Sequence, residues 1–154
     1  MKRTAIAILL FALSLSILGC DFNAAYYDDA EIAKIRDSHL TKMSFIKSVG
    51  REYNQTATFT GTKTIWRYNA SSDDDVSLSY LLSVSEGGKA KLVLITPDNE
   101  VIILIENTDN TVYTEMQTQT ISVKRGVSRI KIVGHESPKI EVSLRTESGR
   151  FITD

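Results

Sequence analysis

The stretch that decides the fold is Val76-Ser77-Leu78-Ser79-Tyr80-Leu81-Leu82-Ser83-Val84-Ser85. Apolar residues occupy every second position, and serines fill most of the positions between them. Successive side chains of a β-strand point to opposite faces, so this pattern predicts a strand with one buried and one solvated face. Glu86-Gly87-Gly88 follows as a turn signal, which indicates a second strand from Lys89 to Thr96.

Further strands are predicted on both sides of this pair. Pro97-Asp98-Asn99-Glu100 is a turn signal between two apolar runs, so residues 101–106 are expected to pair back as a hairpin. The other predicted strands cover residues 58–68, 118–123, 127–133 and 140–145. About seven short strands at regular spacing favour a mainly β protein, an antiparallel β-sandwich over residues 55–147 that is jelly-roll or immunoglobulin-like in outline.

A helical pattern precedes the strands. Asp28 or Asp29 is a suitable N-cap, and the apolar side of the pattern follows at spacings of three and four, through Ile32, Ile35, His39, Met43 and Ile46. The pattern predicts one amphipathic helix within residues 29–50, with Gly50 as its stop. His39 lies within the apolar stripe, so a packed histidine is favoured over a ligand.

Two predicted strands are apolar on both faces: Leu92-Val93-Leu94-Ile95 and Ile102-Ile103-Leu104-Ile105. Such strands need cover on each side. The opposite sheet covers one face, and either the amphipathic helix or a partner protein covers the other. The helix is the simpler expectation.

The N-terminus carries a lipobox, Ile17-Leu18-Gly19-Cys20, that ends on the only cysteine. Lys2 and Arg3 form a positive n-region, and an apolar region from residue 5 to residue 18 follows. A membrane-spanning helix needs roughly 20 apolar residues, and this run is shorter. The layout is similar to that of bacterial lipoprotein precursors. It implies a signal peptide over residues 1–19 and a lipidated Cys20 as the mature N-terminus, rather than a buried or spare thiol.

Lipidation of Cys20 sets the expected location. Two acyl chains anchor a protein stably, so the chain is expected on the outer face of the cytoplasmic membrane. Residues 20–28 are interpreted as a lipidated tether, in which Phe22, Tyr26 and Tyr27 either lie at the headgroup level or pack under the domain. Residues 148–154 are expected to form a C-terminal tail.

Composition bounds the remaining possibilities. About 135 residues follow the signal peptide, enough for one domain with a core. Removing Lys2 and Arg3 changes the formal net charge from −1 to −3, so no nucleic-acid partner is indicated. No disulfide forms once Cys20 is acylated, and the exported domain depends on its core alone.

Three segments of the predicted sandwich carry a family resemblance: residues 59–65, FTGTKTI; residues 91–99, KLVLITPDN; and residues 125–134, RGVSRIKIVG. They resemble segments of small uncharacterised lipoproteins from clostridia and relatives. The resemblance covers most of residues 55–147. It implies a fold and a location on the cell surface, and it assigns no functional residue.

Catalytic residues are scarce in this sequence. His39 and His135 are the only histidines, and no serine stands in a G-x-S-x-G context. Paired His or Cys metal motifs and phosphate-binding glycine loops are also absent. An enzyme is therefore not expected, although a hydrolase needs only two carboxylates and stays as the least favoured class.

Asp73-Asp74-Asp75 is the densest acidic cluster. Calcium takes about 6 to 8 oxygen ligands, and loops at one end of a sandwich can supply them. Further ligands would come from Asp98, Asn99 and Glu100, or from Asp109 and Asn110. The spacing is not that of an EF-hand, so a solvated turn before a strand is favoured over calcium, and no other cofactor is expected.

Two further groups of side chains could bind a ligand. Trp66 and Tyr68, with Arg67 between them, could form a stacking platform for a carbohydrate, but a core position for Trp66 is favoured. The basic residues could face anionic lipid or cell-wall polymer, although alternation favours the solvent side of a strand: Lys124, Arg125, Arg129 and Lys131.

The sequence thus favours a non-enzymatic, membrane-anchored surface lipoprotein whose sandwich binds an extracellular ligand or protein partner. The alternatives are an accessory subunit that docks on a membrane complex and, less favoured, a hydrolase of envelope polymers.

Overall fold

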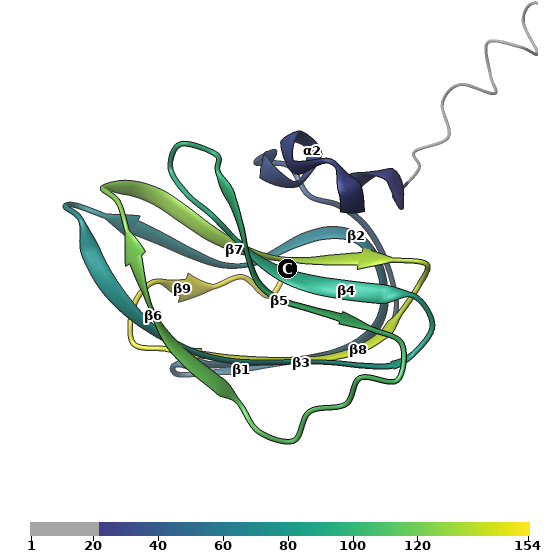
Figure 1. The fold of residues 1–154 in the computed structure, drawn as a ribbon. Helices are drawn as coiled ribbons and strands as arrows, with labels where there is room; N and C mark the ends of the chain where they lie inside the picture. The colour runs from purple at the N-terminus through teal and green to yellow at the C-terminus, as the bar shows by residue number, and fades with distance from the viewer. Residues whose placement is uncertain (1–21) are drawn as a thin grey trace, which may run out of the picture.

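The computed structural model describes residues 22–154, which form an antiparallel β-sandwich (Figure 1). Two short helical segments precede nine strands. The elements are η1 (Ala24–Tyr27), α2 (Asp29–Ala33), β1 (Ser38–Val49), β2 (Glu52–Ala70), β3 (Asp74–Glu86), β4 (Lys89–Ile95), β5 (Val101–Thr108), β6 (Gln117–Val123), β7 (Gly126–His135), β8 (Lys139–Thr146) and β9 (Arg150–Phe151).

The strands follow the order β5-β4-β7-β2-β8-β3-β6, and β1 and β9 pair with β2. These seven strands of the main path are the seven expected from the sequence, so the predicted fold class is confirmed. β2 is long enough to belong to both layers. Residues 52–58 pair with β8 in the lower layer, and residues 61–70 pair with β7 in the upper layer.

The chain bends sharply where it passes between the layers (Figure 1). Gly61 stands at the bend of β2 with a φ of +98°, and a Cβ there would lie 2.2 Å from the carbonyl oxygen of Ser38. Only glycine fits such a position without strain. Glu136 and Ser137, in the turn between β7 and β8, also adopt positive φ.

The core fills the space between the layers. Alternate residues of β3 point into it, and β2, β7 and β8 contribute from both layers. Its largest fully buried side chains include Trp66, Tyr53 and Phe59. Burying a side chain of this kind stabilises the fold by roughly 1.5–3 kcal/mol each.

The predicted helix over residues 29–50 is wrong beyond Ala33. Asp28 is its N-cap as expected, since its carboxylate accepts hydrogen bonds from the amides of Ala30 and Glu31. The helix ends after five residues, and residues 38–49 form strand β1 instead. Gly50 is part of the turn between β1 and β2, not a helix stop.

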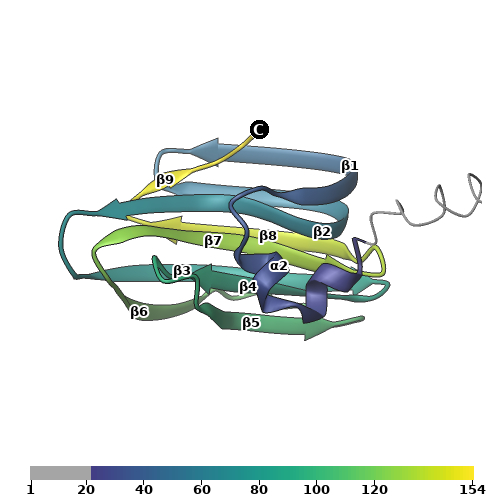
Figure 2. The same cartoon turned by 90° about the horizontal axis from the view of Figure 1, so that it is seen from above.

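The covering role expected for the helix is confirmed for β4. Ile32 is buried and packs with Tyr26 against the outer side of β4 and β7, on Val93, Ile95 and Val133. Figure 2 shows η1 and α2 lying over these strands. The outer side of β5 is left exposed at Ile102 and Ile103, so the prediction fails for that strand.

Both ends of the described chain are more ordered than predicted. Residues 24–27 of the expected tether form η1, and Tyr26 is buried while Tyr27 is exposed. In the expected tail, Arg150–Phe151 form β9, which pairs with Trp66 and Arg67. The domain therefore begins close to residue 22 and includes part of the predicted tail.

Candidate functional site

The outer side of the lower layer is polar, and we call it the polar face. It is open over β2 and β8, whereas Leu81 and Ser83 of β3 are buried. It is formed by the outward residues of β2, β8 and β3, while their inward neighbours are in the core. These outward residues carry hydroxyl, amide and charged groups with one leucine among them: Glu52, Asn54, Thr56 and Thr58; Lys139, Glu141, Ser143 and Arg145; Ser79, Leu81, Ser83 and Ser85. Figure 1 shows α2 above the upper layer, on the side away from the polar face.

Strand register places four residues in one row across the polar face, and the backbone of Tyr113 lies at the end of the row. Phe45 pairs with Thr56, Thr56 with Glu141, and Glu141 with Ser83. The hydroxyl of Ser83 then binds the backbone of Tyr113, accepting from its amide at 2.9 Å and donating to its carbonyl at 3.2 Å. Strands lie about 4.8 Å apart, so the aromatic residues at the two ends of the row are separated by about 14 Å or more.

A recess of about 330 Å³ lies beside this row, and we call it the Thr58 recess. The bulge of β1 forms one wall with Met43, and the loop before β6 forms the other with Val112. Threonine and serine hydroxyls lie between these apolar walls, together with one cation, Lys139, and one carboxylate, Glu141.

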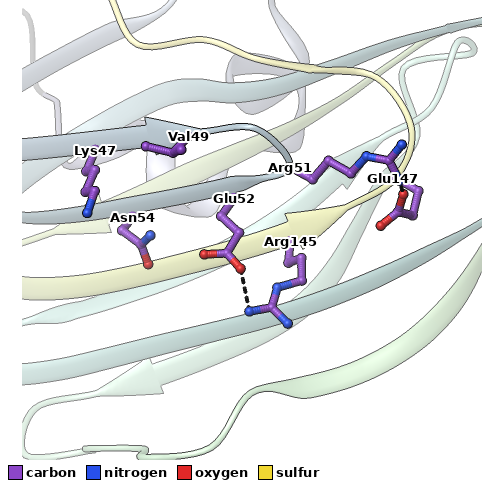
Figure 3. A pocket seen from close by; sticks show the side chains of 7 residues that line it. All are labelled: Lys47, Val49, Arg51, Glu52, Asn54, Arg145 and Glu147. Carbon is purple, nitrogen blue, oxygen red and sulfur yellow. Dashed lines mark ion pairs between the residues drawn. The ribbon is translucent and has the colours of Figure 1, made fainter.

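A second recess of about 570 Å³, the Arg145 recess, lies further along β2 (Figure 3). Glu52 and Arg145 form an ion pair at 2.5 Å, and Arg51 pairs with Glu147. Asn54 also lines this recess, and Thr56, two residues along the same strand, lines the Thr58 recess. The two recesses therefore adjoin along residues 52–58, a length of about 20 Å at the rise of a strand.

Sequence reasoning missed this face because the residues of β1 were assigned to a helix. Only a strand puts Phe45 beside Thr56. Tyr113 was missed because it lies in an irregular segment, where periodicity carries no signal.

The predicted aromatic platform is wrong for Trp66. Its ring is fully buried in the core, and its Nε1 donates a hydrogen bond to the carbonyl oxygen of Ser148 at 2.8 Å. Tyr68 is partly buried, and its hydroxyl donates to Asp74 at 2.7 Å. A sugar cannot reach the Trp66 ring, so the favoured core interpretation holds.

The three carboxylates of the acidic cluster diverge. Asp73 accepts from the amide of Arg125, Asp74 from Tyr68, and Asp75 from the hydroxyl of Ser122. Within residues 22–154, no three His, Cys, Asp or Glu side chains are grouped as metal ligands are. The contact between Asp75 and Ser122 supports the pairing of β3 with β6.

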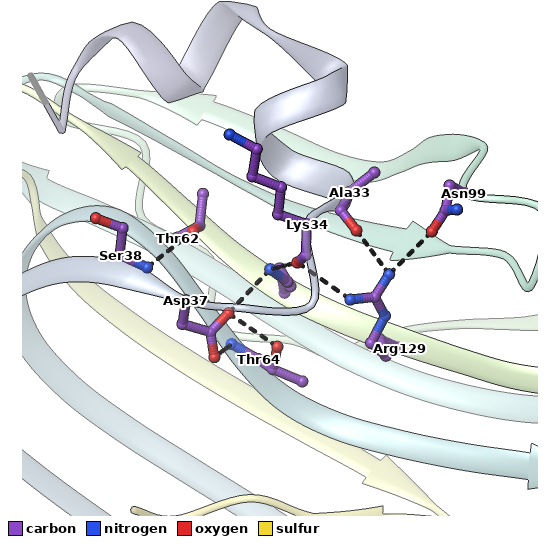
Figure 4. Close-up of polar contacts among 9 residues, drawn as sticks. Ala33, Lys34, Asp37, Ser38, Thr62, Thr64, Asn99 and Arg129 are labelled. Carbon is purple, nitrogen blue, oxygen red and sulfur yellow. Dashed lines mark hydrogen bonds and ion pairs between the residues drawn. The ribbon is translucent and has the colours of Figure 1, made fainter.

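Arg129 and Lys131 are buried, so both readings of the basic set are wrong for them. They lie under residues 33–37, which cross the outer side of β2 and β7 (Figure 4). Arg129 donates to the carbonyl oxygens of Ala33 at 2.7 Å and Lys34 at 3.1 Å. Lys124 and Arg125 are exposed, as predicted.

Lys131 is the most buried charge among the residues described. Its Nζ lies 2.9 Å from Oδ1 of Asp37 and donates to the carbonyl oxygen of Lys34 at 2.6 Å. Asp37 also accepts from the amide and hydroxyl of Thr64. Burial lowers the pKa of Lys131 below its ordinary value, and the neighbouring carboxylate of Asp37 opposes this shift. This cluster fixes the N-terminal segment to the sheet.

The two histidines lie on different elements. His39 is an exposed residue of β1 whose ring stacks on Phe59 with centroids 5.6 Å apart. Desolvation and the charge of Lys63 lower its pKa. His135 ends β7 and packs edge-on against Tyr26 and Tyr27. Neither histidine lines the recesses of the polar face.

The predicted signal peptide and Cys20 lie outside the described residues. Across residues 22–154, no helix is both long enough and apolar enough to cross a bilayer.

No protein-family model and no curated protein matches this chain. Solved structures that align with it include a family 35 carbohydrate binding module from an environmental isolate, at 13% identity and a TM-score of 0.38, over 80% of this chain and 93% of that one. A structure described as "CBM4 structure and function" aligns at 10% identity and 0.34, over 83% and 84% of the two chains. An arabinose-bound MgGH51 α-L-arabinofuranosidase aligns at 11% and 0.26, over 80% of this chain and 27% of that one. Similarity this weak carries no inference about function.

Proposed function

We propose that this chain is a non-enzymatic binding domain that holds an extracellular carbohydrate polymer on its polar face. The observation that carries the proposal is the pair of adjoining recesses along residues 52–58. They are open to solvent and about 20 Å long together. Polar side chains line most of the Arg145 recess, and the Thr58 recess combines hydroxyl groups with a mainly apolar surface. An extended ligand with many hydroxyl groups fits these properties.

The position of the recesses favours a ligand that is bound through side-chain contacts and not through backbone hydrogen bonds. An extended peptide commonly binds by adding a strand to a free sheet edge, where backbone groups are unpaired. The polar face lies over β2 and β8, which are paired on both sides. Hydroxyl and amide groups both donate and accept hydrogen bonds, as sugar hydroxyls do.

Phe45 and Tyr113 supply the apolar part of the proposed contact. Their side chains are 67% and 40% exposed, and they end the row in which Thr56 and Glu141 form the floor. Aromatic faces pack well on the C–H faces of sugar rings and contribute roughly 1 kcal/mol each. The row therefore combines stacking at its ends with hydrogen bonding between them.

Binding of envelope polysaccharide fragments by calorimetry tests the proposal. Phe45→Ala and Tyr113→Ala should each weaken binding by about fivefold to tenfold. Val127→Ala, an exposed apolar residue of β7 on the other layer, is the matched control and should leave affinity unchanged. Saturable binding that survives both aromatic substitutions would place the ligand elsewhere and contradict the proposal.

We further propose that Cys20 carries the lipid that holds the domain on the outer face of the cytoplasmic membrane. The lipobox and the preceding apolar region support this. Metabolic labelling with a fatty-acid analogue should mark the wild-type chain and not Cys20→Ala. Label retained in the variant, or a mature protein that starts at another residue, would refute lipidation at this position.

A second candidate function is docking on a protein partner through β1. This edge strand carries four exposed apolar side chains, Leu40, Met43, Phe45 and Val49. Leu40 pairs with Thr60, beyond residues 52–58, so it lies outside both the recesses and the row that Phe45 and Tyr113 end. Leu40→Ser should therefore abolish co-purification with a partner but preserve binding of a carbohydrate, and the comparison separates the two functions.

A further inference from the structure

Three arginines lie in register across the outer side of the upper layer. Arg67 of β2 is paired with Arg129 of β7 on one side and with Arg150 of β9 on the other. Residues paired in this way have Cβ atoms about 5 Å apart, and like charges directly opposite each other are destabilising. Such a row calls for negative charge nearby.

Of these three arginines, only Arg129 has a guanidinium group that donates hydrogen bonds to protein oxygens among residues 22–154. It donates to two backbone carbonyls of the N-terminal segment and to Asn99. In the part of the chain from residue 22 onward, no carboxylate forms an ion pair with Arg67 or Arg150. The buried Nε of Arg67 has no hydrogen-bond partner. Burial and the charge of Arg67 lower the pKa of Arg129, and the charge of Asp37 opposes this shift.

Both free arginines face open space. A recess of about 380 Å³ is lined by Arg67 and Arg150 with Thr64, Asp37 and the segment 151–154. A second recess of about 470 Å³ shares the same two arginines. Two carboxylates also line the first recess. Asp37 forms an ion pair with Lys131, and the charges of Asp154 and Asp37 raise the pKa of Lys63 against the stronger effect of burial.

We propose that Arg67 and Arg150 form a binding site for a tetrahedral oxyanion of the phosphate type. The planar guanidinium groups offer paired donors that match two oxygens of such an anion. The anion would add negative charge beside Arg67 and Arg150, which form no ion pair with a carboxylate of residues 22–154. The site lies on the upper layer, so it is independent of the polar face.

Calorimetric titration of the full chain in a neutral detergent with inorganic phosphate tests this site. We expect saturable binding that weakens with added salt, since the contact is electrostatic. Arg150→Gln, at an exposed position, should weaken it at least tenfold. Arg67→Lys keeps the charge but loses the paired donors, so it should also weaken binding several-fold. Arg51→Gln removes the same charge on the lower layer and should leave the affinity for phosphate unchanged.

A parallel titration with glycerophosphoglycerol identifies the source of the anion. Tighter binding of this phosphodiester than of phosphate would indicate an esterified group, as in a lipid headgroup or wall polymer. Tighter binding of phosphate would indicate the free anion. Absence of saturable binding to both probes, or an equal loss in Arg150→Gln and Arg51→Gln, would overturn the site.

Discussion

The burial of Lys131 depends on residues far away in the sequence. Alternation around Ile130 and Ile132 correctly sets Lys131 on the outer side of its strand, but it does not reveal what covers that side. The cover is the segment 33–37, almost a hundred positions earlier in the chain. A buried ammonium requires partners, and Asp37 and the carbonyl of Lys34 provide them.

Removing Asp37 should therefore be costly. Asp37→Ala leaves the ammonium of Lys131 buried without its counter-charge, and we expect the free energy of unfolding to fall by about 3 kcal/mol in urea denaturation. Asp98→Ala breaks an exposed pair with Lys124 and is the matched control, with an expected loss under about 1 kcal/mol. Equal effects of the two substitutions would contradict the buried pair.

The penalty should also depend on pH. The folded-state pKa of Lys131 is lowered from the ordinary 10.5, and it should fall further without Asp37. Between the folded and unfolded pKa values the unfolded chain binds more protons, so this group makes stability rise with pH. The difference in unfolding free energy between wild type and Asp37→Ala should hence shrink as pH rises from neutral toward 10.5. A difference that is constant over this range would argue against a charged Lys131.

At the scale of elements, the N-terminal region shows how a strand can be mistaken for a helix. The spacing of Ile32, Ile35, Met43 and Ile46 fits a helix, but a bulge between Lys42 and Phe45 interrupts the alternation of β1. The alternation is regular only after the bulge, where Phe45 points outward and Ile46 packs on the core. The regular alternation after the bulge is too short to distinguish a strand from a helix by periodicity.

Substitution of the isoleucines separates the element that covers β4 from the segment that follows. Ile32→Ala should reduce the free energy of unfolding by about 2–5 kcal/mol, because the side chain is fully buried against β4. Ile35→Ala should change it by less than about 0.5 kcal/mol, since Ile35 is 76% exposed. Thermal and chemical denaturation of the two variants measure both values. If both variants lose a comparable amount of unfolding free energy, Ile35 is buried like Ile32, and the covering element continues past Ala33.

The sequence predicted those elements whose signal is local. The strand around Leu78 and the turns at Gly87 and Asn99 follow from alternation and turn residues, and Asp28 caps a helix as expected. Strand β9 has two residues, too few for any pattern. The row on the polar face was out of reach because it depends on register between β1, β2, β8 and β3, which no single segment records.

At the scale of the whole molecule, residues 22–37 act as part of the domain. They cover Val93, Ile95 and Val133 and supply the partner of Lys131. A chain that begins at Ser38 should expose this apolar area and aggregate, while one that begins at Phe22 should remain monomeric in size-exclusion chromatography. A monomeric, equally stable chain from Ser38 would show that the segment is dispensable.

Asn23 attaches the start of the described chain to the turn after β7, and this attachment would help several anchored copies to bind one polymer. Its side-chain oxygen accepts a hydrogen bond from the amide of Glu136 at 2.8 Å, so the folded domain begins three residues after Cys20. Three residues span at most about 11 Å, so a lipid on Cys20 would hold the domain close to the membrane. Neighbouring copies in one membrane could then reach the same long polymer. Under the proposed function each copy would bind one segment of the polymer, and simultaneous engagement of linked sites would raise avidity by roughly 10²–10⁴.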